Sequence, residues 1–371
     1  KKMSIKQLWC DKYRPERFDQ FQFHQNEAIR LKKLISQENF PHLFIYGPCG
    51  SGKRTIVRSL LFEIFGSTSR KLKIETKIFE APSGKKVIQT FLSSNLHLEV
   101  NPSENGYYDR VVIQELIKNM ATNLSAIKKY PFKMIVIDQA DSLTKEAQQA
   151  LRRTMEKYAE TCRIILMAEH SSRIIPALKS RCLMFRCSAP STVELGQVLQ
   201  TISNAEQFEC NESLINNVIH ESDQNVRRAI ILLQTIAIQQ ELNSQRNNNN
   251  TGQKLEQFRW PQKLNDLSKK LTSTQSVKQV AEIRQILFDL QTHLIPSNII
   301  LRTLVCNLMD FCLDDEMKSN LISIAAEIDH RLIQGSKPII HLELFCVKFM
   351  MMFRCTVEKV AFDLEQPMDL D

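Results

Sequence analysis

The chain lacks several features that would assign it to common classes of protein. In its 371 residues no apolar run approaches the roughly 20 residues that a helix needs to cross a bilayer, so no membrane partner is expected. None of its 10 cysteines falls in a C-x-x-C pair, which argues against a zinc site. The first residues carry no secretory signal, and we therefore expect reduced thiols in the cytosol or nucleus.

The size and charge of the chain indicate a globular protein with more than one domain. At 371 residues it exceeds the size at which a single core usually stops growing, so two or three domains are expected. Its 49 Lys+Arg against 41 Asp+Glu give a net charge of +8, which fits a polyanionic partner. A solvated basic surface would have the same composition.

The first half of the chain alternates strand and helix patterns. Short apolar runs predict strands at His42–Tyr46, Met134–Ile137, Ile164–Ala168 and Leu183–Arg186. Apolar periodicity predicts helices at Thr55–Phe65 and Thr144–Tyr158, the latter with Thr144 as its N-cap. Strands separated by helices favour an α/β domain over residues 1–190, with a parallel sheet covered by helices on both faces.

The second half reads as helical. Amphipathic patterns cover Thr192–Glu206, Glu212–Ile238, Leu301–Leu313, Met317–Leu332 and Ile339–Phe353. Between them lies a polar, Asn-rich stretch that is typical of a linker. We therefore expect a small helical domain over 191–242, a linker over 243–256 and a C-terminal helical domain over 257–371.

A phosphate-binding loop is the clearest motif. Residues 47–55 read G-P-C-G-S-G-K-R-T, which meets G-x-x-x-x-G-K between a strand and a helix. Glycines let backbone N–H groups form a nest around phosphate oxygens, the helix N-terminus adds a positive dipole end, and the lysine adds a charge. The predicted nucleotide-binding positions of the loop are Gly47, Pro48, Cys49, Gly50, Ser51, Gly52, Lys53, Arg54 and Thr55.

One position of this loop departs from the pattern. The residue after the lysine is normally Ser or Thr, whose hydroxyl holds Mg²⁺, but here it is Arg54, which has no acceptor. Thr55 lies about 100° further round the helix and should not substitute. Arg54 could neutralise phosphate charge or turn to solvent. We expect ordinary Mg²⁺ coordination to be lost and predict no metal ligands.

The strand at Met134–Ile137 ends in a similar departure. A hydrophobic strand followed by D-E supplies a carboxylate for Mg²⁺ and a base for the attacking water, but here Asp138 is followed by Gln139. Glu169, after the next strand, puts a carboxylate where a neutral residue would sense phosphate, or it points away and pairs with Arg173. Both departures predict little hydrolysis.

Several further motifs resemble one family. Residues 8–15 (LWCDKYRP), 147–156 (AQQALRRTME) and 180–182 (SRC) resemble motifs of the small subunits of replication factor C, the clamp loader of the AAA+ class. Residues 98–103 (LEVNPS), 109–115 (DRVVIQE) and 330–345 resemble the small subunit whose ATPase site is degenerate. The resemblance covers essentially the whole chain apart from the Asn-rich linker.

The resemblance implies an AAA+ P-loop domain, a helical lid and a helical collar. It also implies a nuclear heteropentamer with other replication factor C subunits that loads the sliding clamp, proliferating cell nuclear antigen, onto primer–template DNA. Nucleotide, ATP or ADP, would be bordered by Tyr13, Arg14, Asp138 and Arg227. On spacing alone Arg181 reads as a surface residue, but the resemblance makes it an arginine finger for a neighbour's ATP.

DNA contacts follow from the same resemblance. Family members track the DNA backbone with helix N-termini and basic residues, and the matching positions are Arg110, Lys118, Thr144 and Lys145. Solvated surface charge is the alternative for each. Two other readings stay open for the chain: a self-sufficient ATPase in which Thr55 or water rescues the metal site, and the same subunit in the alternative loaders of checkpoint and cohesion pathways.

Overall fold

The computed structural model describes residues 7–36, 40–80, 86–102, 106, 108–122, 132–208, 210–245, 259–273, 276–312, 314–335 and 337–365. It divides into two compact units, 1–253 and 254–371. The division falls inside the predicted linker 243–256. Residues 243–245 of that stretch are helical, and the rest lies outside the described residues.

A seven-stranded sheet forms the centre of the first unit, as far as the chain is described, in the order β2-β3-β4-β5-β6-β1-β7. Its strands are β1 (His42–Tyr46), β2 (Lys73–Glu80), β3 (Lys86–Ser93), β4 (His97–Val100), β5 (Lys133–Ile137), β6 (Cys162–Ala168) and β7 (Cys182–Arg186). The four predicted strands are present as β1, β5, β6 and β7. Together with β4 they form the parallel part of the sheet, in which Phe44 of β1 lies opposite Leu166 of β6.

The predicted parallel sheet is confirmed over its main part, and the sequence did not indicate the antiparallel edge, where β2 and β3 form a hairpin and β3 also pairs antiparallel with β4. These strands mix polar and apolar residues instead of forming continuous apolar runs. Ile78 of β2 lies directly opposite Ile88 of β3, and both are exposed, as is Ile74. Only the other face of the hairpin, with Phe79 and Phe91, packs into the core.

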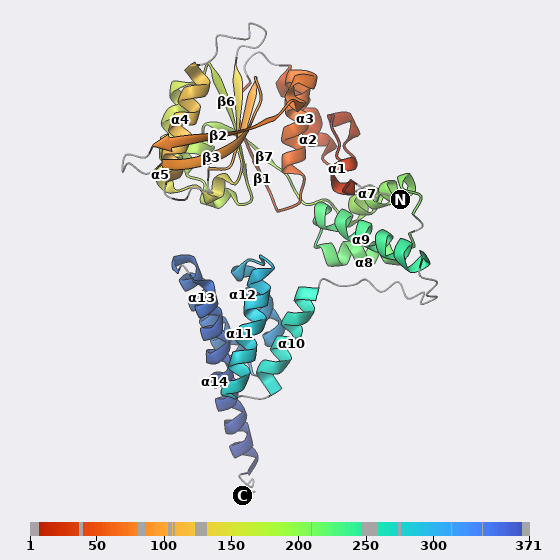
Figure 1. Ribbon diagram of the computed structural model, residues 1–371, viewed down its shortest axis with the longest axis vertical. Helices are drawn as coiled ribbons and strands as arrows, with labels where there is room; N and C mark the ends of the chain where they lie inside the picture. Colours follow the sequence, from red (N-terminus) through yellow and green to blue (C-terminus); the bar gives the residue numbers. More distant parts are fainter. Residues whose placement is uncertain are drawn as a thin grey trace, which may run out of the picture. The chain divides into compact units, whose positions relative to one another are not determined.

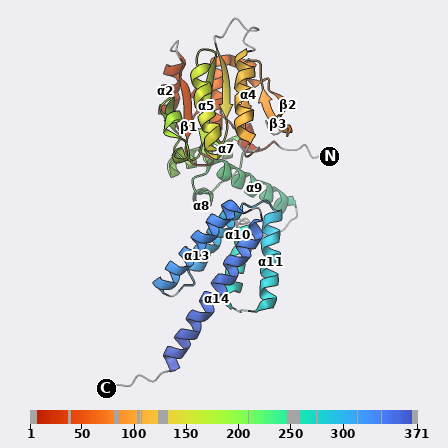
Figure 2. The same cartoon turned by 90° about the vertical axis from the view of Figure 1, so that its left-hand side faces the viewer.

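Helices cover both faces of the sheet, as predicted (Figure 1). On one face lie α4 (Asp109–Thr122) and α5 (Lys145–Lys157), and on the other lie α2 (Gln25–Ile35) and α3 (Lys53–Phe65). The alternation of β1 serves both layers, because Phe44 packs with the first pair of helices while Leu43 and Ile45 pack with the second. Figure 2 shows α4 and α5 side by side.

A helical lid completes the first unit. It consists of α7 (Thr192–Ala205), α8 (Glu212–Ser222) and α9 (Val226–Gln245). The range Glu212–Ile238 is thus two helices, interrupted where Asp223 and Gln224 adopt left-handed backbone (φ 50° and 59°). The short α1 (Trp9–Lys12) reaches the lid, since the Trp9 N–H donates to Gln234 Oε1 at 3.0 Å. A further short helix, α6 (Pro176–Lys179), precedes β7.

The second unit is a helical bundle, as predicted. Its helices are α10 (Arg259–Ser273), α11 (Val277–Thr292), α12 (Ser297–Met309), α13 (Asp315–Gln334) and α14 (Pro338–Glu365). Fully buried side chains such as Leu304, Leu321, Phe345 and Phe349 form its core. Among the helices of the described chain, none combines the length and the apolar character that crossing a membrane requires.

Candidate functional site

A cavity of about 380 Å³ lies where β1, β5 and β6 end and the lid begins. The predicted nucleotide-binding residues that line it are Tyr13, Arg14, Cys49, Gly50, Gly52, Lys53, Arg54, Thr55, Asp138 and Arg227. The other predicted loop positions, Gly47, Pro48 and Ser51, are not among its lining residues. Parallel strands open their carboxyl ends to ligands in α/β folds, so this is the place where a nucleotide is expected.

The loop that follows β1 has the backbone of a phosphate nest. Gly50 (φ 76°) and Gly52 (φ 94°) are both left-handed, which only glycine adopts freely, and α3 begins at Lys53. The Lys53 Nζ donates to the carbonyls of Gly47 (2.8 Å) and Pro48 (2.9 Å), so the loop wraps around the ammonium group. N–H groups, helix dipole and cation converge on one wall of the cavity, which fits a polyphosphate.

The adjacent wall does not fit ordinary Mg²⁺ coordination. The Arg54 guanidinium forms an ion pair with Asp138 (Nη2–Oδ2 2.5 Å), and the other oxygen of Asp138 accepts from the Gln139 N–H at 3.0 Å. Asp138 is the carboxylate that would support the metal ion. Arg54 has only donors, so it cannot itself be a metal ligand, and it binds the oxygen that would face the ion. The sequence left two orientations open for Arg54, toward phosphate or toward solvent. In the structure its guanidinium binds the Asp138 carboxylate.

The water-activating positions are also altered. Gln139, where a Glu would polarise water, accepts a hydrogen bond from Asn101 Nδ2 (3.3 Å) on its Oε1. Glu169 lines the cavity, and its backbone N–H donates to Asp141 Oδ2 at 3.3 Å. An amide cannot take a proton from water, and a carboxylate at Glu169 repels phosphate.

Other lining residues were missed from the sequence. Phe21 and Phe23 from the N-terminal arm, with Val226 and Ile230 from the lid, give the cavity apolar lining next to its cationic loop. No sequence pattern predicts that the arm, the loop and a lid helix meet, because only the tertiary fold brings these distant segments together. An apolar surface beside a cationic one suits a nucleotide, which has both an aromatic base and phosphates.

Tyr13 ties the arm to the lid at the cavity's edge. Its hydroxyl donates to Glu206 Oε1 at 2.7 Å, and Lys12 donates to the same oxygen at 2.6 Å. Burial, followed by the contact with Glu206, raises the pKa of the Tyr13 phenol, so it stays protonated and continues to donate. Arg227 is exposed at the start of α9 and lines the cavity from the lid side.

Arg181 lies apart from these residues. It is not among the side chains that line the cavity, and it forms an ion pair with Glu156 at the end of α5. Its Nη1 also donates to the Ala177 carbonyl at 2.7 Å. The guanidinium is thus held in place, while the Arg181 side chain as a whole is 34% exposed.

The starts of α4 and α5 are joined by one buried carboxylate. Thr144 caps α5 as predicted, since its Oγ1 accepts from the Ala147 N–H at 3.2 Å. Asp109, at the start of α4, accepts from the Thr144 N–H (2.8 Å) and hydroxyl (2.9 Å). The two helix N-termini therefore open toward the same side.

The predicted DNA-contacting residues gather only in part around these termini. Arg110 and Lys145 are both exposed at the helix starts, although Arg110 is near Glu146 (Nη1–Oε2 3.6 Å). Lys118 is exposed roughly 12 Å further along α4, at 1.5 Å per residue. Arg110, Thr144 and Lys145 thus form one group, and Lys118 stands separately.

Comparison with known protein families covers most of the chain. Residues 24–191 match the model of the DNA polymerase III delta subunit, and residues 197–238 match the RCF1/5-like AAA+ ATPase lid domain. Residues 260–357 match the C-terminal domain of replication factor C subunit 3. Among solved structures, the Thermotoga maritima RuvB Holliday junction branch migration motor is 14% identical, with a TM-score of 0.46 over 69% of this chain and 79% of that one.

Whole-length relatives are similar across both units. Replication factor C subunit 3 of Homo sapiens is 38% identical over 353 residues, which cover 95% of this chain and 97% of the relative. Replication factor C subunit 5 of Schizosaccharomyces pombe is 40% identical over 348 residues, covering 93% and 96%. On this identity and coverage, the chain belongs to the replication factor C subunit 3/5 family.

Proposed function

We propose that the chain is a subunit of a nuclear clamp loader, in which it assembles with other replication factor C subunits and helps to place the sliding clamp on primer–template DNA. Membership of the family supports the assembly, and the lid and C-terminal bundle match models from that family. In this role the subunit binds nucleotide, contacts DNA and hydrolyses little ATP itself.

The Arg54–Asp138 ion pair carries the proposal for the nucleotide site. A guanidinium beside the phosphates supplies positive charge where Mg²⁺ would otherwise stand, and it is always protonated. The site would therefore hold ADP or ATP through Lys53, the loop amides and Arg54, with no metal. Without a metal and without a base at Gln139, the bound nucleotide would persist and serve assembly.

Titration of the isolated full-length subunit with ADP tests this proposal directly. Binding should have the same affinity in excess EDTA as in excess Mg²⁺, and ATP should turn over no faster than in buffer. A loss of affinity of tenfold or more in EDTA would contradict metal-free binding. Turnover comparable to that of active AAA+ proteins would favour the self-sufficient ATPase, with Thr55 or water completing the metal site.

Arg181 is proposed to act on the neighbouring subunit's ATP. It is exposed in part, is fixed by Glu156 and lies outside this chain's own cavity. Replacing Arg181 with Ala should lower ATP hydrolysis by the assembled loader at least a hundredfold at that interface, by analogy with arginine fingers. Arg173→Ala, which removes another exposed arginine eight residues earlier in the chain, is the control. Unchanged hydrolysis with intact assembly would remove the finger role.

The shared N-termini of α4 and α5 are proposed to contact the DNA backbone. Backbone N–H groups at helix starts, together with Arg110 and Lys145, would bind phosphates without reading sequence. Lys145→Ala in the assembled loader should weaken DNA binding uniformly and lower the slope of log K against log salt by about 1. Lys157→Ala, at the opposite end of α5, should leave that slope unchanged.

The same subunit could serve loaders of checkpoint and cohesion pathways. Its surfaces for nucleotide and for neighbouring subunits would be the same there. Identification of the large subunit that co-purifies with a tagged chain distinguishes these assemblies.

A further inference from the structure

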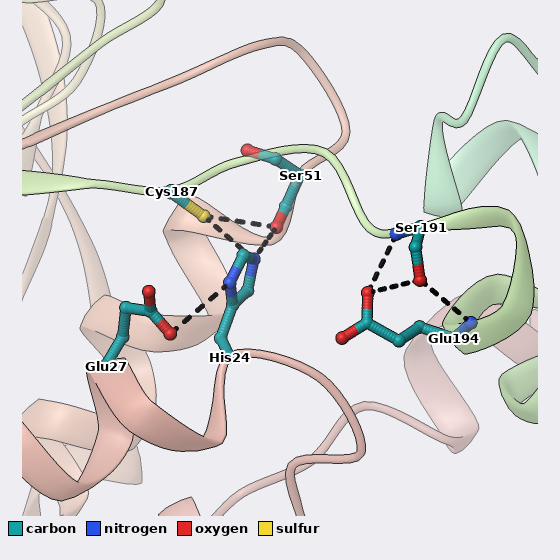
Figure 3. Close-up of polar contacts among 6 residues, drawn as sticks. All are labelled: His24, Glu27, Ser51, Cys187, Ser191 and Glu194. Carbon is teal, nitrogen blue, oxygen red and sulfur yellow. Dashed lines mark hydrogen bonds and ion pairs between the residues drawn. The ribbon is translucent and has the colours of Figure 1, made fainter.

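Three segments meet beneath the phosphate loop (Figure 3). His24 precedes α2, Ser51 lies in the loop, and Cys187 immediately follows β7. All three residues are buried, with exposed fractions of 8%, 1% and 1%. None of them was singled out for a contact of this kind by the sequence, and neither His24 nor Cys187 lines the nucleotide cavity.

One backbone carbonyl is the centre of this cluster. The Ser51 carbonyl oxygen is 3.2 Å from His24 Nε2 and 3.2 Å from the Cys187 Sγ, which donates to it. A carbonyl only accepts, so Nε2 carries a proton when it makes this bond. Burial raises the pKa of the Cys187 thiol, so the sulfur keeps the proton that it donates.

The segment that carries Cys187 is also pressed against the start of the loop. The Cys187 N–H donates to the Tyr46 carbonyl at 2.8 Å, and a Cβ built on Gly47 would lie only 1.9 Å from the Cys187 carbonyl oxygen. No side chain fits at Gly47 unless the two segments separate. Tyr46 and Ser51 are thus both attached to Cys187, one at each end of the turn that leads into the loop.

The contacts of the Ser51 carbonyl also fix the direction of the Gly52 N–H, because both groups belong to one peptide bond. In a planar trans peptide the carbonyl of Ser51 and the N–H of Gly52 point in opposite directions. Because the Ser51 carbonyl faces the buried His24 and Cys187, the Gly52 N–H faces away from them, and Gly52 lines the cavity. A flip of this peptide turns ψ of Ser51 and φ of Gly52, and because Gly52 is a glycine that tolerates φ of either sign, the peptide could otherwise flip.

We propose that His24 and Cys187 are positioning residues for nucleotide binding, which hold the Ser51 carbonyl inward and so aim the Gly52 N–H at the phosphates. With the peptide flipped, a carbonyl oxygen would face the phosphate oxygens and repel them. The inference rests on the proposed nucleotide binding and assigns to it two residues that do not touch the ligand.

Cys187 also lies close in sequence to the start of the lid. Residues 188–190 separate Cys187 from Ser191, which begins the lid with a capping box: its Oγ accepts from the Glu194 N–H (3.2 Å), and Glu194 Oε2 accepts from the Ser191 N–H (2.8 Å; Figure 3). Pro190 has a fixed φ and restricts Ala189 before it, so Ser188 is the least constrained residue of this connection. The lid is thus joined to the rest of the chain within a few residues of the group that sets the Gly52 amide.

Conservative substitutions of the full-length subunit separate positioning from folding. Cys187→Ser keeps a donor and should bind ADP like the wild type. Cys187→Val has no donor and is larger by about one methyl group, and it should bind roughly threefold to tenfold more weakly, as expected for one lost hydrogen bond. His24→Gln should retain more affinity than His24→Leu, for the same reason. Cys162→Val, in a buried cysteine at the far end of β6, should leave ADP affinity unchanged.

A spectroscopic readout reports the amide itself. Labelling with ¹³C-carbonyl serine and ¹⁵N-glycine links signals only at Ser51–Gly52 and Ser83–Gly84, the two Ser-Gly pairs of the sequence. ADP should shift the Gly52 amide in the wild type and Cys187→Ser, and shift it less in Cys187→Val.

The outcomes distinguish the two levels of inference. Wild-type protein that binds no ADP would remove the proposed nucleotide binding. Wild-type protein that binds ADP, with Cys187→Val and His24→Leu both binding equally well and both shifting Gly52, would remove only the positioning role. If His24→Leu fails to fold, the Cys187 pair decides.

Discussion

The two sides of the nucleotide cavity differ in how far their residues match an ordinary P-loop site. The phosphate side (Gly50, Gly52 and Lys53) keeps left-handed glycines, a helix start and a lysine held by loop carbonyls. The metal side (Arg54, Asp138 and Gln139) has an arginine bonded to the metal-supporting carboxylate and an amide in place of the base. The difference teaches that the groups suited to holding phosphate and the groups suited to metal and water lie on different side chains in this fold, so one set can change while the other stays.

Lys53→Ala should have the largest effect, because it removes the only charge of the phosphate side. Losing a charge-assisted contact of about 2–3 kcal/mol should weaken ADP binding roughly a hundredfold. Calorimetric titration measures the change, with Lys33→Ala, at an exposed position of α2, as the control. Retained affinity would mean that the metal side carries the binding.

Arg54→Thr should have the next largest effect, because it restores a hydroxyl and frees Asp138. The variant should bind ADP roughly tenfold more tightly with Mg²⁺ than with EDTA, whereas the wild type should show no difference. Arg54→Lys keeps the positive charge and should stay indifferent to the metal. Mg²⁺ dependence in the wild type itself would show that Arg54 does not stand in for the ion.

Asp138→Asn should change ADP affinity less than threefold in EDTA. In an ordinary P-loop site this change removes metal support, but here it only releases Arg54. The fold should tolerate it as well, since Arg54 is about half exposed (49%) and such pairs contribute about 0–1 kcal/mol. Titration in EDTA and a thermal melt test both statements, and a large loss of affinity would give Asp138 a direct role.

Gln139→Glu alone should have the smallest effect on turnover. It restores the base, but Arg54 still occupies Asp138, so no metal-bound water is prepared. ATP hydrolysis by the isolated variant should stay at the buffer rate. Mg²⁺-dependent turnover in this variant would locate the defect in Gln139 and would remove the role given to Arg54.

The sequence predicted those parts of the fold in which local pattern and final environment agree. The run at His42–Tyr46 is β1 residue for residue, because a strand buried on both faces is apolar throughout. The β2–β3 hairpin was missed, because one of its faces is exposed and its apolar residues are interspersed with polar and charged ones. The break between α8 and α9 was missed because Asp223 and Gln224 take the left-handed backbone without any glycine.

The candidate site divides in the same way. The loop motif predicted that Lys53, Gly50 and Gly52 would line the cavity, and they do. The loss of metal coordination, inferred from the absent hydroxyl at position 54, stays a prediction. The partner of Arg54 could not be predicted, because Asp138 lies 84 residues away and either residue had other options. His24 and Cys187 gave no signal at all, since they act on a backbone carbonyl, which no side-chain motif records.

The edge strand β2 has a consequence for how copies of the chain meet one another. One side of β2 pairs with β3, and within the described residues no strand pairs with its other side, which lies beside the exposed Ile74 and Ile78. Such edges recruit further strands and start aggregation. The sequence of β2, K-I-E-T-K-I-F-E, places a charge at every second or third residue, which obliges any stacked copy to meet like charges in parallel register. Growth of copies in parallel register along this edge is thereby disfavoured.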